Sequence, residues 1–332
     1  MQTASVPLSL FPAEIPLPPR EATSLSSIAM LCSLSISAWS GYRYDKETSE
    51  EIAQLHDAEK DAGRFNKRLV PRNALKEITQ AIGQARRDHE FLTLPWGDNG
   101  SRLLPGATYM EHTNLMKQRK QEFEAAVARF VDGFENLVRT QGRLGTLLKI
   151  EDYPGMIEEG GRLRFVRPQE LRTRFSIDTK IAPIHDANDF RVAISDEERE
   201  RIKRQIAQSV EASIRVGTRD LWQRLYKTVA HMSERMNEYN AAQEGNRPKL
   251  YTSMVTNIVD IVDVLPSLNI GGDADLNRMA EEVRQALVVD TKQLRKSESL
   301  RSEAAQKATE IAQRMAAYMG VPAGGPTTSG LV

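Results

Sequence analysis

Apolar and small residues recur at helical spacing between Ser195 and Pro248. They fall in turn at Ile202, Ile206, Val210, Ile214, Gly217, Leu221, Leu225, Val229, Met232, Met236 and Tyr239. The mean step of about 3.7 residues is close to the period of an α-helix. Ser195 and Glu198 form a capping box, which favours a helix start at this point. The pattern therefore predicts one straight helix of about 60 Å as the spine of the molecule.

A second apolar stripe predicts a helix from about Tyr109 to Arg139, with Phe123, Val127, Phe130, Phe134 and Leu137 on one face. Shorter helices are expected at Asp45–His56, from Asn73 to about Phe91, from Leu250 to Leu265 before Pro266, and after a cap at Asp273 or Asp275. Alternation of apolar and polar residues predicts strands at Ser33–Tyr42, Phe65–Val70, Ser176–Ile184 and Asp189–Ile194, the last two as a hairpin. The expected fold is mainly α within the α+β class, with long helices and a small antiparallel sheet.

The last expected helix, from about Lys292 to Met319, is rich in alanine. One of its sides carries Ala304, Ala308, Ile311 and Met315. This face has too few large side chains to form a core of its own. It should therefore dock on the long helix from Ser195 or on a second subunit. The four residues are the expected oligomer contacts in the second case.

The chain divides by composition into four parts. Five prolines mark residues 1–22 as a flexible arm, since proline removes backbone donors. Residues 23–290 should form a helical body with the small sheet, with two lobes as an option and a boundary near 145–175. The alanine-rich helix occupies 291–319, and residues 320–332 are expected to be disordered because they have little apolar surface.

Charge and cysteine content narrow the classes of function. The 45 Lys and Arg residues balance the 45 Asp and Glu residues, so no global field draws the chain to nucleic acid or to an anionic membrane. The single cysteine, Cys32, excludes a disulfide within the chain and a zinc site built from cysteines, and it favours the reducing cytoplasm. No basic residue precedes Arg20 and no apolar run reaches the roughly 20 residues of a membrane span. Neither a secretory signal nor a membrane helix is therefore expected.

The segment TLPWGDNGSRLLPG, Thr93 to Gly106, combines turn-forming residues with apolar anchors. Prolines stiffen both ends, glycines allow a turn with positive φ, and a tryptophan and two leucines can anchor the loop. An ordered loop of this kind suits either a packed connector between two helices or a binding loop. The binding residues in the second case would be Trp96, Asp98, Asn99 and Arg102.

Arginines and aromatic residues are interleaved in GGRLRFVRPQELRTRF, Gly160 to Phe175. This mixture suits phosphate contacts and base stacking, so a nucleic-acid site is one interpretation. Its members would be Arg162, Arg164, Phe165, Arg167, Arg172 and Arg174. The alternative is that the arginines lie along the helical body and pair with its carboxylates.

Residues able to support catalysis or metal binding are sparse. His185, Asp186 and Asp189 could form a metal or acid–base cluster, but the same residue types make good turns between strands. Asp88, His89 and Glu90 are consecutive on an expected helix, so they point in different directions and fit a solvated helix end. The sequence holds no Walker A, G-x-S-x-G or H-E-x-x-H motif. No catalytic residue, metal ligand or cofactor is assigned, and an enzymatic activity has no support in the sequence.

Several blocks between about Ser33 and Ile270 carry a family resemblance: SISAWSG, NKRLVP, TLPWGDNGSRLLPG with the nearby Tyr109, RTRFSID, DLWQRLYKTVAHMSERM and VDVLPSLNI. Together they resemble a domain family of unknown function from tailed phages and from bacteria that carry prophages. The family is often encoded near a MoxR-like AAA+ ATPase, which the resemblance implies as a partner. It brings no assigned activity and no catalytic residue. This chain has Tyr42 before Arg43 where the family has a basic residue directly after the glycine of the first block.

These observations predict a phage or prophage accessory protein that acts by binding or assembly and not by catalysis. It would be a homo-oligomer or a partner of an AAA+ ATPase in the cytoplasm, which is the host cytoplasm if a phage encodes it. The alternative is a nucleic-acid-binding accessory factor centred on Arg162 to Arg174. No membrane partner is expected.

Overall fold

Helices dominate the structure, and one small sheet accompanies them. The computed structural model describes residues 25–97, 100–140, 149, 152–159, 162–184, 195–242 and 250–320. These residues form a mainly helical α+β fold with a four-stranded antiparallel sheet and two hairpins, so the expected fold class is confirmed. The proline-rich arm, the expected strand at 189–194 and the tail from residue 321 lie outside the described residues.

The chain forms two compact units. Unit 1 comprises residues 1–31, 92–109 and 182–332, and unit 2 comprises residues 32–91 and 110–181. The sequence offered two lobes, with a boundary near residues 145–175, as one option. In the structure the chain passes from one unit to the other after residues 31, 91, 109 and 181.

The small sheet has the strand order β4–β5–β1–β8. Its strands are β1 (Ala29–Ser37), β4 (Leu94–Pro95), β5 (Arg102–Pro105) and β8 (Ser176–Ala182). The antiparallel register of β4 and β5 places Leu94 opposite Leu103. The two hairpins pair β2 (Tyr42–Tyr44) with β3 (Asn66–Arg68) and β6 (Met156–Glu159) with β7 (Arg162–Phe165).

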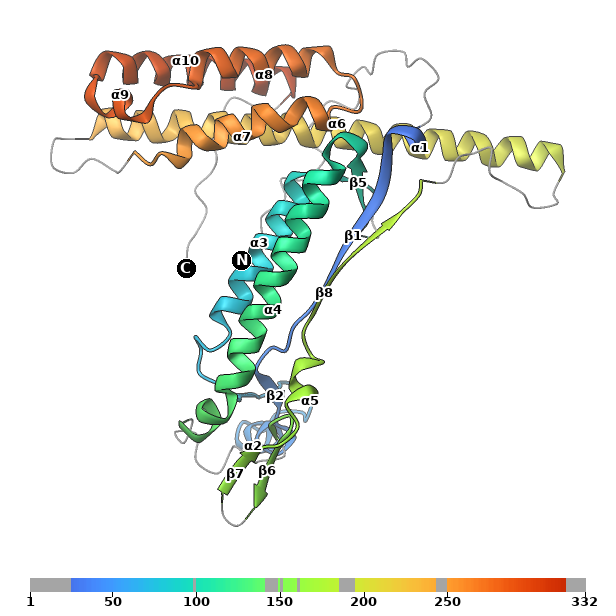
Figure 1. Cartoon of the computed structure of the whole chain (residues 1–332), viewed down its shortest axis with the longest axis vertical. Coiled ribbons are helices and arrows are strands. Elements are labelled where there is room, and N and C mark those ends of the chain that lie inside the picture. Colours follow the sequence, from blue (N-terminus) through green and yellow to red (C-terminus); the bar gives the residue numbers. More distant parts are fainter. Residues whose placement is uncertain are drawn as a thin grey trace. The chain divides into compact units, whose positions relative to one another are not determined.

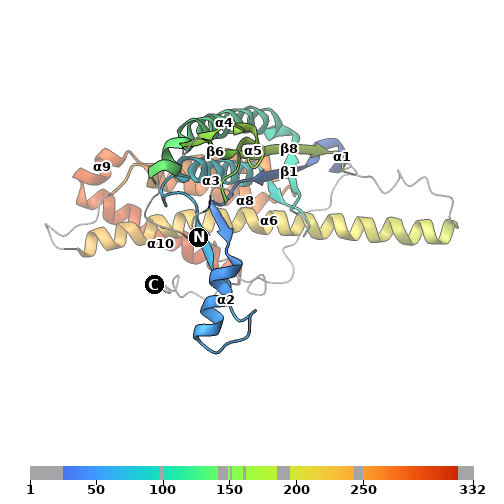
Figure 2. The same cartoon turned by 90° about the horizontal axis from the view of Figure 1, so that it is seen from below.

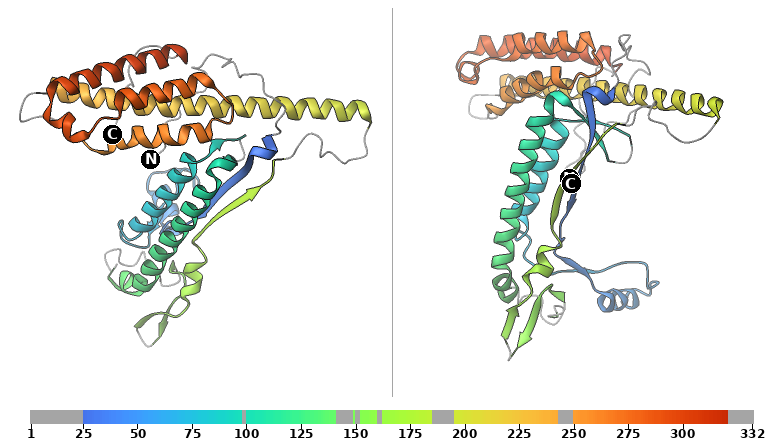
Figure 3. Two further views of the ribbon diagram at one scale, coloured as in Figure 1. Left: turned by 45° about the horizontal axis from the view of Figure 1, so that its top comes forward. Right: turned by 45° about the vertical axis from the view of Figure 1, so that its right-hand side comes forward.

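Unit 1 is built around α6 (Asp196–Ala241), a single helix of 46 residues. Figure 2 shows it as one unbroken helix. The expected start is confirmed, because the Ser195 hydroxyl accepts a hydrogen bond from the backbone N–H of Glu198. Alongside its C-terminal half lie α7 (Ser253–Leu268), α8 (Ala274–Leu287) and α10 (Glu298–Tyr318) (Figure 1 and Figure 3). The predicted stripe of α6 is buried only from Ile214 onward.

The shorter helices of unit 1 correct two predicted boundaries and decide between two predicted caps. The expected end of α7 before Pro266 is wrong, because the proline sits in the last turn, where it removes only one intrahelical bond, and the helix runs on to Leu268. Asp273, and not Asp275, caps α8. The final helix is two helices, α9 (Thr291–Lys296) and α10, because the chain breaks at Ser297 and its hydroxyl caps α10.

The alanine-rich face of α10 packs against α6. Ala304, Ala308, Ile311 and Met315 are all buried. The hydroxyls of Ser233 on α6 and Thr309 on α10 lie 2.8 Å apart. Of the two expected docking partners, the structure shows the long helix. The four residues are therefore covered within the chain and do not form an open surface for a second subunit.

Unit 2 packs α3 (Lys76–Phe91) and α4 (Tyr109–Thr140) side by side over one face of β1 and β8 (Figure 1 and Figure 3). The predicted stripe of α4 lies in this core, with only Leu137 partly buried. Phe134 is fully buried and its ring contacts those of Trp39, Phe130, Tyr153 and Phe165. Two short helices complete the unit, α2 (Lys46–Leu55) and α5 (Pro168–Arg172).

The start of α3 differs from the expected cap at Asn73. Residues 72–75 form a turn in which the Asn73 carbonyl accepts the backbone N–H of Lys76, so the helix begins later.

Among the described residues, no helix is both long and apolar enough to pass through a lipid bilayer.

Candidate functional site

The loop from Thr93 to Gly106 is fastened by two arginines. Arg102 Nε donates to the Thr93 hydroxyl at 2.7 Å, and Arg102 Nη2 donates to the Thr93 carbonyl at 3.1 Å. Arg224 of α6 donates to the same carbonyl at 2.8 Å. Because Thr93 is fully buried, these bonds satisfy polar atoms that water does not reach. Arg102 therefore has a structural task in the loop.

The rest of the loop contains the turn and the tryptophan that the sequence singled out. Gly97 and Gly100 have φ values of 57° and 76°, as expected for the turn. Trp96 is half-buried, and Asp98 and Asn99 lie outside the described residues. The described part favours a packed connector, and the binding loop stays a prediction.

The arginine-rich segment of unit 2 is accompanied by carboxylates. Its ion pairs are Arg164 with Glu159, Arg167 with Glu170, and Arg172 with Asp132. The Phe165 ring packs in the core, 5.1 Å from the Phe134 centroid, while Arg174 is exposed and the side chain of Arg162 is outside the description. Because paired arginines attract phosphate less, the segment fits the paired-surface interpretation better than a nucleic-acid site.

Three buried side chains with metal-ligating atoms meet in unit 2. Cys32 comes from β1, His89 from α3 and His112 from the first turn of α4, and they are 1%, 4% and 0% exposed. The Cys32 sulfur and one nitrogen of each imidazole all lie within 4.8 Å of one another. His89 Nδ1 and His112 Nε2 are 2.9 Å apart, which is a hydrogen-bond distance.

This cluster corrects one interpretation of the sequence and shows the limit of another. A solvated helix end is wrong for His89, because the residue continues the inward face of α3 formed by Ile78, Ile82 and Ala85. A single cysteine excludes a site built from cysteines alone, but it does not exclude a mixed cysteine–histidine site. The other histidine cluster, at residues 185–189, lies outside the described residues.

Burial sets the protonation of the cluster. It raises the pKa of the Cys32 thiol to about 11, so the sulfur carries a proton at neutral pH. Burial also lowers the pKa of His112, so its imidazole is neutral. A neutral histidine is the form that ligates metal ions, whereas the thiol must lose its proton to do so.

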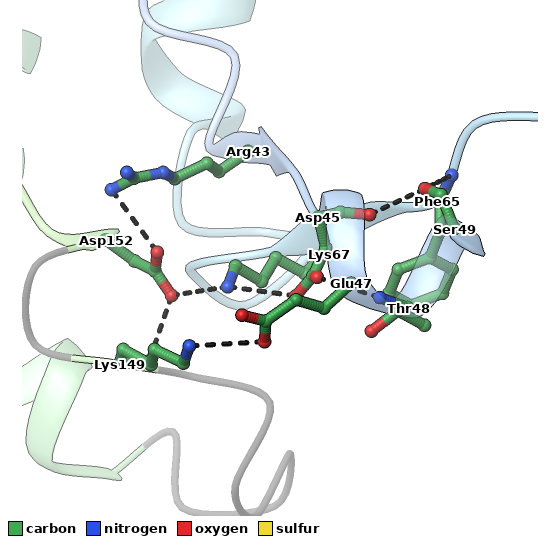
Figure 4. A network of polar contacts seen from close by, with 9 residues as sticks. All are labelled: Arg43, Asp45, Glu47, Thr48, Ser49, Phe65, Lys67, Lys149 and Asp152. Atoms are coloured by element: carbon green, nitrogen blue, oxygen red, sulfur yellow. Dashed lines mark hydrogen bonds and ion pairs between the residues drawn. The ribbon is translucent and has the colours of Figure 1, made fainter. Parts of the chain in front are cut away.

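A second polar cluster in unit 2 surrounds Lys67 (Figure 4). Its ammonium lies 2.8 Å from Asp152 Oδ2 and 3.0 Å from Asp45 Oδ2. Arg43 pairs with the other oxygen of Asp152 at 3.3 Å. The remaining oxygen of Asp45 accepts the backbone N–H of Thr48 and so caps α2.

The Lys67 network has the properties of a structural clamp. Burial alone would lower the pKa of the Lys67 ammonium, but its hydrogen bonds to Asp152 and Asp45 outweigh burial and raise it. The lysine therefore stays charged between two carboxylates, a state that suits neither proton transfer nor nucleophilic attack. The contacts join β2, α2 and β3 to the segment at Asp152.

Comparisons of the chain with protein-family models, with curated proteins and with solved structures found no match in any of the three.

Proposed function

We propose that this chain is a phage or prophage accessory protein that acts by binding another protein, and that the N-terminal part of α6 is its binding surface. The observation that carries the proposal is the uneven burial of α6. None of residues 196–213 is buried, although Ile202, Ile206 and Val210 continue the stripe that is buried from Ile214 onward. The yellow part of α6 extends beyond α7, α8 and α10 (Figure 1).

The charged residues of this segment leave the apolar stripe as its distinguishing feature. Ion pairs within the helix join Asp196 with Arg199, Glu198 with Arg201, Glu200 with Lys203, and Glu211 with Arg215. Such pairs support an exposed helix at a few tenths of a kcal/mol each. Each pair also places a carboxylate beside a basic side chain, which weakens the attraction of that side chain for the phosphates of a nucleic acid. An amphipathic helix of this kind is a common surface for a partner helix.

On the strength of the family resemblance, the partner that we propose is a MoxR-like AAA+ ATPase. The proposed compartment of this binding is the cytoplasm. A second copy of the chain is the alternative occupant of the same stripe. The nucleic-acid alternative has less support, because the described arginines of that segment are largely paired.

The test is a pair of double variants with equal charge on opposite faces of the helix. Ile206→Asp with Val210→Asp alters the stripe, and Gln208→Asp with Ala212→Asp alters the exposed opposite face. Binding to the purified MoxR-like ATPase from the same genome is measured by biolayer interferometry. The stripe variant should bind at least about tenfold more weakly, and the control variant should bind as the unaltered chain does.

Two results would overturn the assignment. Equal affinity of both variants would show that the stripe is not the surface. Absence of ATPase binding, together with a concentration-dependent mass of the chain alone that only the stripe variant abolishes, would identify a second copy as the occupant. Sedimentation of the isolated chain supplies that measurement.

A further inference from the structure

The Cys32–His89–His112 cluster has no role in the function proposed above. It brings together a thiol and two imidazoles from β1, α3 and α4, three elements that the chain separates by long intervals. All three side chains are buried in unit 2. A thiolate and two imidazoles are a ligand set that suits zinc, whereas calcium and magnesium require oxygen ligands.

The distances are close to those of a metal centre. Zinc–nitrogen bonds of about 2.0–2.1 Å at tetrahedral angles place two imidazole nitrogens about 3.3 Å apart. The observed separation of His89 Nδ1 and His112 Nε2 is 2.9 Å, so binding would part these atoms by a few tenths of an ångström. The sulfur and one nitrogen of each imidazole lie within 4.8 Å of one another, so the three ligand atoms surround a common point.

A simple histidine pair leaves part of this cluster unexplained. His112 is fully buried, and its Nδ1 has no hydrogen-bond partner among the described residues. Buried polar groups normally have a partner, because an unmade hydrogen bond is costly in free energy. The hydroxyl of the adjacent Thr113 is in the same condition.

A cavity adjoins the outer side of the cluster at His112. It has a volume of about 260 Å³ and is lined by His112, Thr113, Met116 and residues of β8. This volume has room for several waters, enough to satisfy His112 Nδ1 and the Thr113 hydroxyl. Zinc sites with three protein ligands typically take water as the fourth.

We propose that Cys32, His89 and His112 bind one zinc ion, with a water molecule as the fourth ligand. Binding replaces the proton of the Cys32 thiol, which leaves to solvent as the sulfur–zinc bond forms. The ion would join β1, α3 and α4 at one point of unit 2 and would stabilise the folded state by mass action.

The test uses the full-length chain after treatment with a chelator. Zinc should bind with one-to-one stoichiometry in calorimetry and raise the melting temperature by a few degrees. Cobalt(II) should give a thiolate-to-metal charge-transfer band, which can arise only from the single cysteine. Metal analysis of the chain as purified identifies the ion that it carries.

Three variants remove the ligands singly, Cys32→Ser, His89→Gln and His112→Gln. Each should weaken zinc binding by more than about 100-fold, because loss of a direct ligand exceeds the 10- to 100-fold effect of an outer-shell partner. His56→Gln is the matched control, since His56 is exposed in the same unit. Circular dichroism of the metal-free forms separates loss of binding from loss of fold.

The outcomes are distinct. No zinc binding by the folded, unaltered chain would overturn the proposal. Zinc binding that persists in the histidine variants would place the ion elsewhere. Copper in place of zinc in the purified chain would overturn the identity of the metal. None of these results depends on the α6 surface, because that segment belongs to unit 1.

Discussion

At the scale of single residues, Lys67 is a buried charged side chain, and such side chains are rarely found without a partner of opposite charge. Its side chain is 6% exposed, and those of Asp152 and Asp45 are 4% and 11% exposed. The ammonium between these two carboxylates balances charges that are largely removed from water. Removal of one member of the network should therefore destabilise the fold, because it leaves the other charges without a partner.

Lys67→Met should lower the free energy of unfolding by about 3–5 kcal/mol, because it leaves two enclosed carboxylates without this cation. Lys149→Met is the control: its ion pair with Glu47 is largely exposed and should contribute less than about 1 kcal/mol. Urea unfolding of both variants measures the difference. Equal effects of the two substitutions would contradict the clamp.

Asp45 gives the network a pH dependence. The hydrogen bond from the Thr48 backbone, followed by that from Lys67, lowers the pKa of Asp45 below its ordinary value of 3.8. A depressed folded-state pKa contributes stability above the unfolded-state value, and this contribution is lost as the pH falls through the folded-state pKa. The stability difference between the unaltered chain and Asp45→Asn should be constant near neutral pH and shrink below about pH 4.

The control for this measurement is Glu51→Gln, which alters an exposed carboxylate of the same helix. Its effect on unfolding should be small throughout the titration. A difference for Asp45→Asn that grows as the solution is acidified would reverse the sign argued here.

The Cys–His cluster shows which residues sequence reasoning could have reached. His89 falls on the stripe through Ile78, Ile82 and Ala85, and His112 lies one turn before Met116 on the stripe of α4. A histidine on an apolar stripe predicts a buried histidine. Its pairing with Cys32 was not predictable, because residues 32, 89 and 112 share no ligand-spacing motif and only tertiary packing joins them.

At the scale of elements, the long helices were predictable because each repeats one buried face over several turns. The break between α9 and α10 was not, since its cause lies in tertiary contacts. The buried Arg301 of α10 donates to the carbonyls of Leu294 and Arg295, which end α9 without an intrahelical partner. Ser297 then caps the next helix. A serine among charged residues and other serines carries little indication of such a break.

Ala308→Leu tests whether the small residues of α10 set its approach to α6. Ala308 is fully buried, so a larger side chain should overpack the interface and lower the free energy of unfolding by about 1–3 kcal/mol. Ala317→Leu, at an exposed position of the same helix, should have little effect. Thermal unfolding measures stability, and sedimentation measures mass. A change of mass without loss of stability would return this face to the oligomer interpretation.

At the scale of the whole molecule, the division into units could not be found from composition. Each unit combines segments that are distant in the sequence, and the segment 92–109 of unit 1 interrupts unit 2 between α3 and α4. Composition marks linkers where the chain loses its pattern, as it does near residues 145–175. It does not mark a short, well-packed excursion such as this one, which has apolar anchors and a buried threonine.

The core of unit 2 predicts that this unit folds without unit 1. Its buried cluster draws only on residues of unit 2, among them Phe123, Phe134 and Leu171. The ends of the interruption lie close together, because the Thr108 hydroxyl donates to the Leu92 carbonyl at 3.1 Å. A fragment of residues 32–181, with 92–109 replaced by a flexible linker of about six residues, should therefore unfold cooperatively in urea.

Phe134→Ala within the fragment supplies the decisive comparison. The ring is fully buried among four other aromatic rings, so its removal should cost about 3–5 kcal/mol in the fragment and in the full chain alike. A similar loss in both would show that the same core forms in isolation. A fragment without a cooperative transition, or one indifferent to Phe134→Ala, would mean that unit 2 acquires its core only within the complete chain.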